Sequence, residues 1–274
     1  MIRKSFFKTS VVIIIALLFF LSSCTTVPIT GRKRIALLPS ANLASMALQS
    51  YQDLLKKSKL STDARQVAIV RKVGQRIAVA AEAFMKEEGL QAQLKNFRWE
   101  FNLIEDAKVV NAFCMPGGKV AVYTGILPVA NDEAGLAVIM GHEVAHAIAS
   151  HGNERMSQLL LVQLGGVALD VALKNKPEET RGMFMLAYGL GAQLGVLLPY
   201  SRTHESESDH IGLILMARAG YDPAAAPAFW QRMSKLAGGK GGPQFLSTHP
   251  SPLKRVKKLQ SLIPEVRTKY FRKR

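Results

Sequence analysis

Residues 137–148 read Ala-Val-Ile-Met-Gly-His-Glu-Val-Ala-His-Ala-Ile and contain the motif His142-Glu143-Val144-Ala145-His146. The apolar flanks predict a buried helix that begins near residue 131 or 132 and runs past residue 150. Residues four apart on a helix lie on one face, one turn apart, so both imidazoles can bind the same metal ion. Glu143 projects beside them, where its carboxylate can take a proton from a metal-bound water. The motif therefore predicts a site for one Zn²⁺ ion per chain, with Glu143 as general base.

A catalytic zinc ion needs a third protein ligand and one open position. Residues 201–209 offer three carboxylates, and two of them, Glu205 and Asp209, lie four apart on one helical face. Spacing alone leaves open which of Glu205, Glu207 and Asp209 binds the ion. We interpret Glu205 as the third ligand and Asp209 as the acceptor that holds a ligand imidazole by its other ring nitrogen. Glu207 is then expected to face solvent or to form a salt bridge.

The rest of the chain is predicted to form helices around a small sheet. Alternating apolar and polar residues predict a strand at 97–103, and shorter strands are predicted at 109–113 and 119–124. The uncharged stretch 182–198 is short for a membrane span, so we expect a buried or surface-docking helix, with a span as the alternative. The predicted fold class is therefore α+β, a mainly helical architecture with a small β-sheet beside the active-site helix.

The N-terminus predicts export and attachment to a membrane. Three basic residues precede an apolar run, which ends in Leu21-Ser22-Ser23-Cys24. An apolar residue, two small residues and a cysteine resemble the lipobox of bacterial lipoproteins, in which the cysteine is acylated. The alternative is an ordinary signal peptide or an uncleaved anchor with a chance cysteine. We expect a signal peptide at 1–23, a lipid-anchored tether at 24–40 and a single catalytic domain at 41–274, located at the outer membrane and facing the periplasm.

The net charge and the two cysteines indicate which partners and which covalent links the chain can have. The net charge is +16, and basic residues gather at 254–258 and 267–274, where we expect a solvated basic tail. No aromatic-interleaved basic patch or recognition motif indicates a nucleic-acid partner. Cys24 and Cys114 are the two cysteines of the chain, so lipidation of Cys24 leaves Cys114 without a partner, and we expect a small, apolar-like side chain there.

These motifs resemble the Ste24 and HtpX family of zinc peptidases. The two histidines are followed some sixty residues later by Ser201-Arg202 and by Glu205-x-x-x-Asp209, and Thr248-His249-Pro250 resembles the family's His-Pro segment. Residues 27–32, Val-Pro-Ile-Thr-Gly-Arg, resemble the periplasmic lipoprotein branch that includes LoiP and BepA. The chain departs from the family pattern at Ser208, where alanine is usual. The resemblance implies a zincin fold and Glu205 as a zinc ligand.

The resemblance also implies roles for residues outside the ligand set. Residues 111–115 would form an edge strand that an extended substrate could join. Asn111 and His249 are candidate donors to the developing oxyanion. His249 could instead occupy the fourth position on zinc and hold the enzyme latent. From its spacing, His151 is expected to be turned well off the ligand face, and His204 and His210 are expected to be surface or local hydrogen-bonding groups.

Two functions follow from the resemblance and from the residues. The first is a metal-dependent endopeptidase acting on unfolded or misassembled envelope proteins. The second is a metal-containing chaperone or assembly factor for outer-membrane proteins with little proteolysis. An intact Glu143 favours the first, because a binding protein has no need of a general base. The oligomeric state and the natural substrate are not defined by the sequence.

Overall fold

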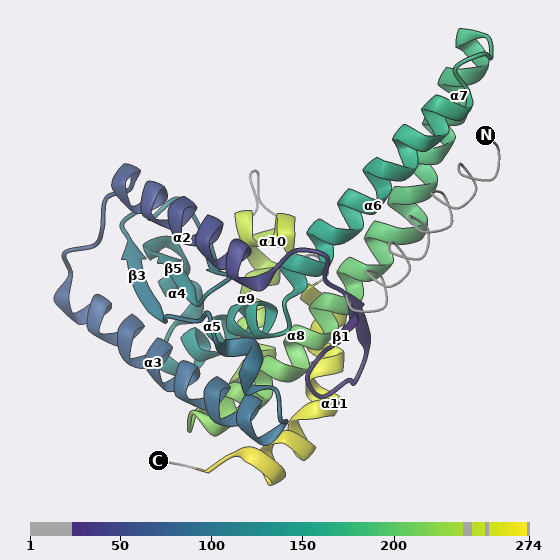
Figure 1. Ribbon diagram of the computed structural model, residues 1–274. Coiled ribbons are helices and arrows are strands. Elements are labelled where there is room, and N and C mark those ends of the chain that lie inside the picture. Colours follow the sequence, from purple (N-terminus) through teal and green to yellow (C-terminus); the bar gives the residue numbers. More distant parts are fainter. Residues whose placement is uncertain (1–23, 238–242, 250–251, 273–274) are drawn as a thin grey trace.

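A three-stranded sheet and a layer of helices form the body of the protein (Figure 1). The computed structural model describes residues 24–237, 243–249 and 252–272. The predicted signal peptide therefore lies outside the described residues. The strands are β3 (Glu100–Ile104), β4 (Ala112–Met115) and β5 (Lys119–Tyr123), in the order β3-β5-β4. β5 pairs parallel with β3 and antiparallel with β4, so the predicted edge strand, β4, does lie at an edge.

Helix α5 (Glu133–Ile148) carries the His-Glu-x-x-His motif through the centre of the molecule. The side chain of Asp132 accepts a hydrogen bond from Gly135 N at 2.8 Å and caps the start of the helix. The helix was predicted to continue past residue 150, and this is wrong. Ser150 adopts a left-handed conformation with φ of 51°, and a new helix, α6 (His151–Ala172), begins at the next residue.

Helix α8 (Leu198–Arg218) crosses α5 at a pair of glycines. A Cβ atom on Gly141 would lie 2.9 Å from Gly212 O, and one on Gly212 would lie 3.0 Å from His142 N. The two backbones can approach this closely only because neither residue has a side chain. Since His142 follows Gly141 and Asp209 lies one turn before Gly212, the crossing brings the two chemical segments of the sequence together.

The remaining helices enclose this crossing. α3 (Ala64–Glu87) packs against α5 and β3, α2 (Ser40–Lys57) packs against β4 and β5, and α9 (Ala225–Ala237) and α11 (Pro252–Tyr270) pack against each other. The apolar core consists of one large cluster and a small second one around Tyr51, and its largest fully buried side chains include Trp230, Phe84 and Phe229. The described chain is thus mainly helical with a small sheet, which confirms the predicted α+β, zincin-like class. The shorter elements are β1 (Cys24–Thr26), β2 (Lys33–Ile35), α4 (Leu127–Ala130) and α10 (Gln244–Thr248).

Helices α6 and α7 (Glu178–Ala192) form an antiparallel hairpin that projects from the body (Figure 1). The Tyr188 hydroxyl donates to Val162 O at 2.8 Å, and Arg181 pairs with Asp170 nearer the tip. Of the two expectations for 182–198, a buried helix is wrong for α7, whose apolar side chains such as Leu186 are exposed, and a surface-docking helix stays a prediction. In the described part of the chain, no helix is both long enough and apolar enough to cross a membrane.

The segment that follows Cys24 packs against the body. β1 and β2 pair as an antiparallel hairpin, and Val27 in the connecting loop is 1% exposed. Ser157 and Asn153 of α6 hold the backbone beyond β2 by hydrogen bonds with Leu37 and Leu38. The last part of the predicted tether, at Leu37 and Leu38, is therefore attached to the first turns of α6.

Candidate metal centre

Four side chains from three parts of the chain converge beside the α5–α8 crossing. His142 and His146 come from α5, Glu205 from α8 and His249 from the end of α10, and one ligand atom of each lies within 4.8 Å of the others. The Nε2 atoms of His142 and His146 are 3.1 Å apart, and His146 Nε2 is 3.3 Å from Glu205 Oε1. Imidazole nitrogens and a carboxylate oxygen are the donors that zinc prefers, so the residues present fit this ion.

Electrostatics at the cluster suit a cation. Burial lowers the pKa of His146 well below its ordinary value, which favours the neutral imidazole that binds metals. Burial alone would raise the pKa of Glu205, but hydrogen bonds with His142, His146 and His249 hold it far below its usual range. The anionic carboxylate of Glu205 therefore faces the neutral ring of His146, a pairing of charge states that suits a metal site.

Asp209 lies next to the imidazole of His142, one of the two candidate histidine ligands, as predicted. Its Oδ1 atom is 3.3 Å from His142 Nδ1, on the side of the ring opposite Nε2. A carboxylate in this place holds the proton on Nδ1 and leaves the Nε2 lone pair free for a metal ion. The role of Asp209 stays a prediction, and the geometry supports it.

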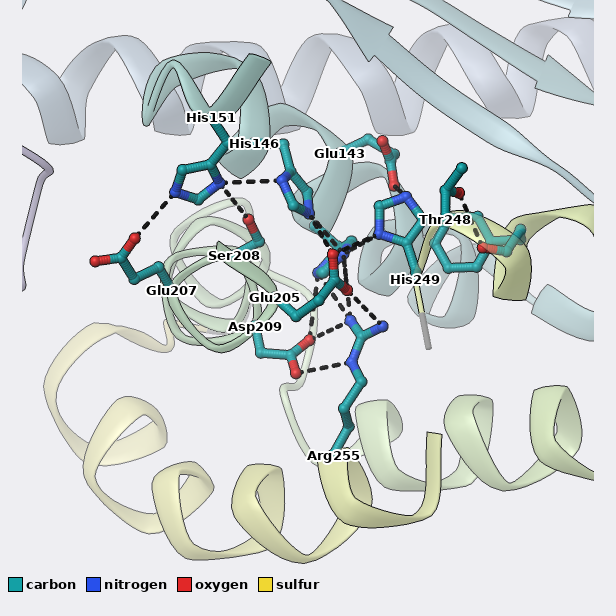
Figure 2. Close-up of polar contacts among 12 residues, drawn as sticks. Glu143, His146, His151, Glu205, Glu207, Ser208, Asp209, Thr248, His249 and Arg255 are labelled. Carbon is teal, nitrogen blue, oxygen red and sulfur yellow. Dashed lines mark hydrogen bonds and ion pairs between the residues drawn. The ribbon is translucent and has the colours of Figure 1, made fainter. Parts of the chain in front are cut away.

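Glu143 is buried beside the ligand cluster and projects toward His249 (Figure 2). Its Oε1 atom lies 3.5 Å from His249 Nε2 and forms no hydrogen bond with any described residue. Burial raises the pKa of Glu143, which brings it closer to the neutral range in which a general base works. Glu143 is thus placed to exchange a proton with a group bound in the cluster.

Arg255 was predicted to lie in a solvated basic tail, and this is wrong. Arg255 is 6% exposed and reaches from α11 to the centre (Figure 2), where its Nε donates to Asp209 Oδ2 at 2.9 Å and its Nη1 lies 3.1 Å from Glu205 Oε2. The guanidinium also stacks on Trp230, with its central carbon 3.5 Å from the ring centroid. The sequence did contain an indication that Arg255 is buried, because its spacing places it on the same helical face as the buried Leu259 and Val266.

A second polar group surrounds His151 and was also missed. His151 was expected to be turned off the ligand face, and this is wrong, because it is 3% exposed and its Nδ1 lies 3.0 Å from Nδ1 of the candidate ligand His146. The helix break at Ser150 turns His151 back toward α5, so a count along a continuous helix misplaced it. Glu207, predicted to face solvent or form a salt bridge, is buried and pairs with Arg32. Burial raises the pKa of Glu207, but hydrogen bonds with His151, Arg32 and Thr30 outweigh it and lower that pKa to about 2.

His204 was expected at the surface or in a local hydrogen bond, and it is buried in such a bond. Its ring stacks on His151 with centroids 4.3 Å apart, and its Nε2 lies 2.9 Å from Glu154 Oε2. The role of Asn111 as a donor to the oxyanion stays a prediction. Its side-chain oxygen accepts from Ala112 N, and no hydrogen bond among the described residues joins it to a candidate ligand.

A cleft of about 730 Å³ runs past the cluster and is lined by His146, Glu205 and His249. Cys114 of the edge strand β4 and the turn at Pro116 and Gly117 line the same cleft. An extended chain lying in it would therefore meet both the unpaired edge of β4 and the candidate metal ligands.

Comparison with known proteins agrees with this geometry. The chain is 39% identical over 181 residues to the mitochondrial metalloendopeptidase OMA1 of Schizosaccharomyces pombe, covering 64% of this chain and 50% of that protein. It is 30% identical over 258 residues to human OMA1, covering 90% of this chain and 47% of that protein. It is 30% identical over 166 residues to the beta-barrel assembly-enhancing protease of Escherichia coli, covering 58% of this chain and 33% of that protein.

The chain thus spans half or less of the length of these three relatives. The model of peptidase family M48 matches residues 66–263, which include both α5 and α8 with the candidate ligands. The match covers most of the chain, and the chain belongs to peptidase family M48.

Proposed function

We propose that this protein is a zinc-dependent endopeptidase of the cell envelope that cleaves unfolded or misassembled proteins. The observation that carries the proposal is the convergence of His142, His146 and Glu205, with Glu143 beside them. These three residues would hold the zinc ion, which would supply a bound water of lowered pKa and polarise the scissile carbonyl. Glu143 accepts the proton of the attacking water at its buried carboxylate and transfers it to the leaving amine.

The substrate lies along β4 in this proposal. The order β3-β5-β4 leaves one side of β4 without a partner strand in the sheet, and this strand lines the cleft. An added strand would be held by main-chain hydrogen bonds, which tolerate varied side chains and require an unfolded segment. A folded protein offers no such segment, so the geometry supports unfolded polypeptides as substrates.

Metal removal tests the function directly. Purified protein should contain about one zinc ion per chain and cleave casein, because the ligand set holds one ion. Stripping the metal with a chelator should abolish cleavage, and returning one equivalent of zinc should restore it. Zinc content is measured by atomic absorption alongside the rate. Casein cleavage that persists without metal would contradict the proposal, and metal binding without any cleavage would favour the alternative assembly factor.

His249 is expected to restrain the enzyme. Its Nδ1 lies 2.9 Å from Glu205 Oε1 and 3.3 Å from His142 Nε2, within the ligand cluster rather than across the cleft from it. A ring in this place would compete with water for the position that the three protein ligands leave open. His249→Ala should therefore raise casein cleavage several-fold with zinc content unchanged. A loss of cleavage would instead assign His249 to transition-state stabilisation, and an unchanged rate would contradict both roles.

Attachment through a lipid on Cys24 completes the proposal and places the protein at the outer membrane facing the periplasm. The lipobox-like residues 21–24 support it, as does the name of the E. coli relative, a beta-barrel assembly-enhancing protease. In a bacterial host, a Cys24→Ala variant should move from the membrane fraction to the soluble periplasm. Cys114→Ala is the matched control and should stay with the membrane. A Cys24→Ala variant that remains on the membrane would contradict lipid anchoring.

A further inference from the structure

The loop between β1 and β2 presents two side chains in a fixed arrangement. It contains the Val-Pro-Ile-Thr-Gly-Arg sequence, which the proposed reaction does not use. Val27 N donates to Arg32 O at 2.9 Å, and Gly31 N donates to Val27 O at 3.1 Å, so the loop is closed by its own backbone. Gly31 has φ of 62°, a conformation that glycine adopts without strain. Thr30 and Arg32 project from this closed loop.

Arg32 bridges two buried carboxylates on different helices. Its Nη1 and Nη2 atoms donate to the two oxygens of Glu154 on α6 at 2.6 and 2.8 Å. Its Nε and Nη2 atoms donate to the two oxygens of Glu207 on α8 at 2.9 and 3.0 Å. Thr30 adds a hydrogen bond from its hydroxyl to Glu207 Oε1 at 2.9 Å. A planar guanidinium suits this double bidentate contact, which the point charge of a lysine cannot reproduce.

Glu207 connects this loop to a candidate zinc ligand. Its Oε2 lies 3.0 Å from His151 Nε2, and His151 Nδ1 lies 3.0 Å from His146 Nδ1 (Figure 2). A carboxylate accepts only, so His151 carries its proton on Nε2 and keeps a lone pair on Nδ1. His146 then donates from Nδ1 and presents the lone pair of Nε2 to the cluster. The path is the counterpart for His146 of the contact between Asp209 and His142.

We propose that Thr30 and Arg32 are positioning residues of the metal site, which fix Glu207 and through it the tautomer and orientation of His151 and His146. This inference rests on the proposed zinc site. The segment that follows Cys24 would then help to position a metal ligand and would not serve only as a tether. Loss of the Arg32 guanidinium leaves two buried carboxylates without their shared cation, and Glu207 loses the group that holds it against His151.

Zinc affinity, measured by competition with a chromogenic chelator, tests the proposal without reference to activity. Arg32→Met should weaken zinc binding about 10- to 100-fold, the usual effect of removing an outer partner of a metal ligand. Lys33→Met is the matched control, because Lys33 is the exposed neighbour of Arg32 and carries the same charge. It should bind zinc as the wild type does. Arg32→Lys should recover only part of the loss.

Substitutions of Thr30 and Glu207 keep the test decisive if Arg32→Met folds poorly. Thr30→Val removes one hydroxyl at nearly constant volume and should weaken zinc binding a few-fold. Adding Thr30→Val to Glu207→Gln should cost nothing further, because both act on one path. The visible spectrum of the cobalt-substituted protein should shift in Thr30→Val, which a loss of stability alone would not cause.

The outcomes separate this inference from the proposed function. A wild type that binds no zinc defeats both. A wild type that binds zinc, together with folded Arg32→Met and Thr30→Val variants of unchanged affinity and unchanged cobalt spectrum, overturns the positioning role alone. Equal loss in Lys33→Met would also overturn it, because the effect would then be one of general charge.

Discussion

Replacing Glu143 with glutamine should lower kcat/KM for casein by about 10²- to 10⁴-fold, the range of general-base catalysis. The amide has almost the same size as the carboxylate, so the packing around this buried side chain is retained. It cannot accept a proton, however, and Glu143 Oε1 is the oxygen that faces the cluster with no hydrogen bond from any described residue. The variant should still contain about one zinc ion per chain, because Glu143 is not in the ligand set.

Zinc content and casein cleavage, measured on the same preparations, check this result. Glu105→Gln is a suitable control, because Glu105 is a solvent-accessible carboxylate paired with Lys59 and remote from the cluster in sequence. It should cleave as the wild type does. Equal cleavage by wild type and Glu143→Gln would remove the proposed mechanism, even if zinc were present in both.

Arg255→Met should lower the free energy of unfolding of the metal-free protein by about 3–5 kcal/mol, the cost of removing one partner of a buried ion pair. Arg255 neutralises Asp209 and Glu205 together, and both carboxylates are buried. Methionine fills part of the space over Trp230 but leaves the two negative charges without their cation. Urea denaturation followed by circular dichroism measures the change.

Lys257→Met gives the matched control for Arg255, since Lys257 is exposed two residues further along α11. Its removal should change the free energy of unfolding by less than about 0.5 kcal/mol. An Arg255→Met protein that unfolds at the wild-type urea concentration would show that the two carboxylates need no buried cation. Zinc should partly restore the stability of Arg255→Met, because the ion supplies positive charge to the same carboxylates.

Local patterns predicted the elements of this fold well. The alternation before the motif indicated a strand, and β3 begins at Glu100 within the expected range. The apolar flanks of His142 and His146 indicated a buried helix, and α5 is almost entirely buried. These signals work because burial on one face imposes a period on the sequence, and that period can be read without knowing what covers the face.

Contacts between distant segments could not be read in this way. Arg255 looked like one cation in a basic run, and only the partner carboxylates on α8 explain its burial. His151 was misplaced because a single left-handed residue, Ser150, turned the chain. Serine seldom adopts a left-handed conformation, so a serine at position 150 did not indicate that the helix ends there. The α5–α8 crossing requires glycine at positions 141 and 212, because the two backbones approach closely there. The sequence alone does not show which backbone lies opposite each glycine, so it could not predict this requirement.

The α6–α7 hairpin has a consequence for how proteins of this kind can diverge. It leaves the body after α5 and returns as α8, and its two arms contact each other along their length. Whole turns gained or lost in both arms would move the tip and leave the separation of His146 and Glu205 in space unchanged. The number of residues between the second histidine and the distant glutamate is therefore free to drift, and a search that demands a fixed interval would overlook related enzymes.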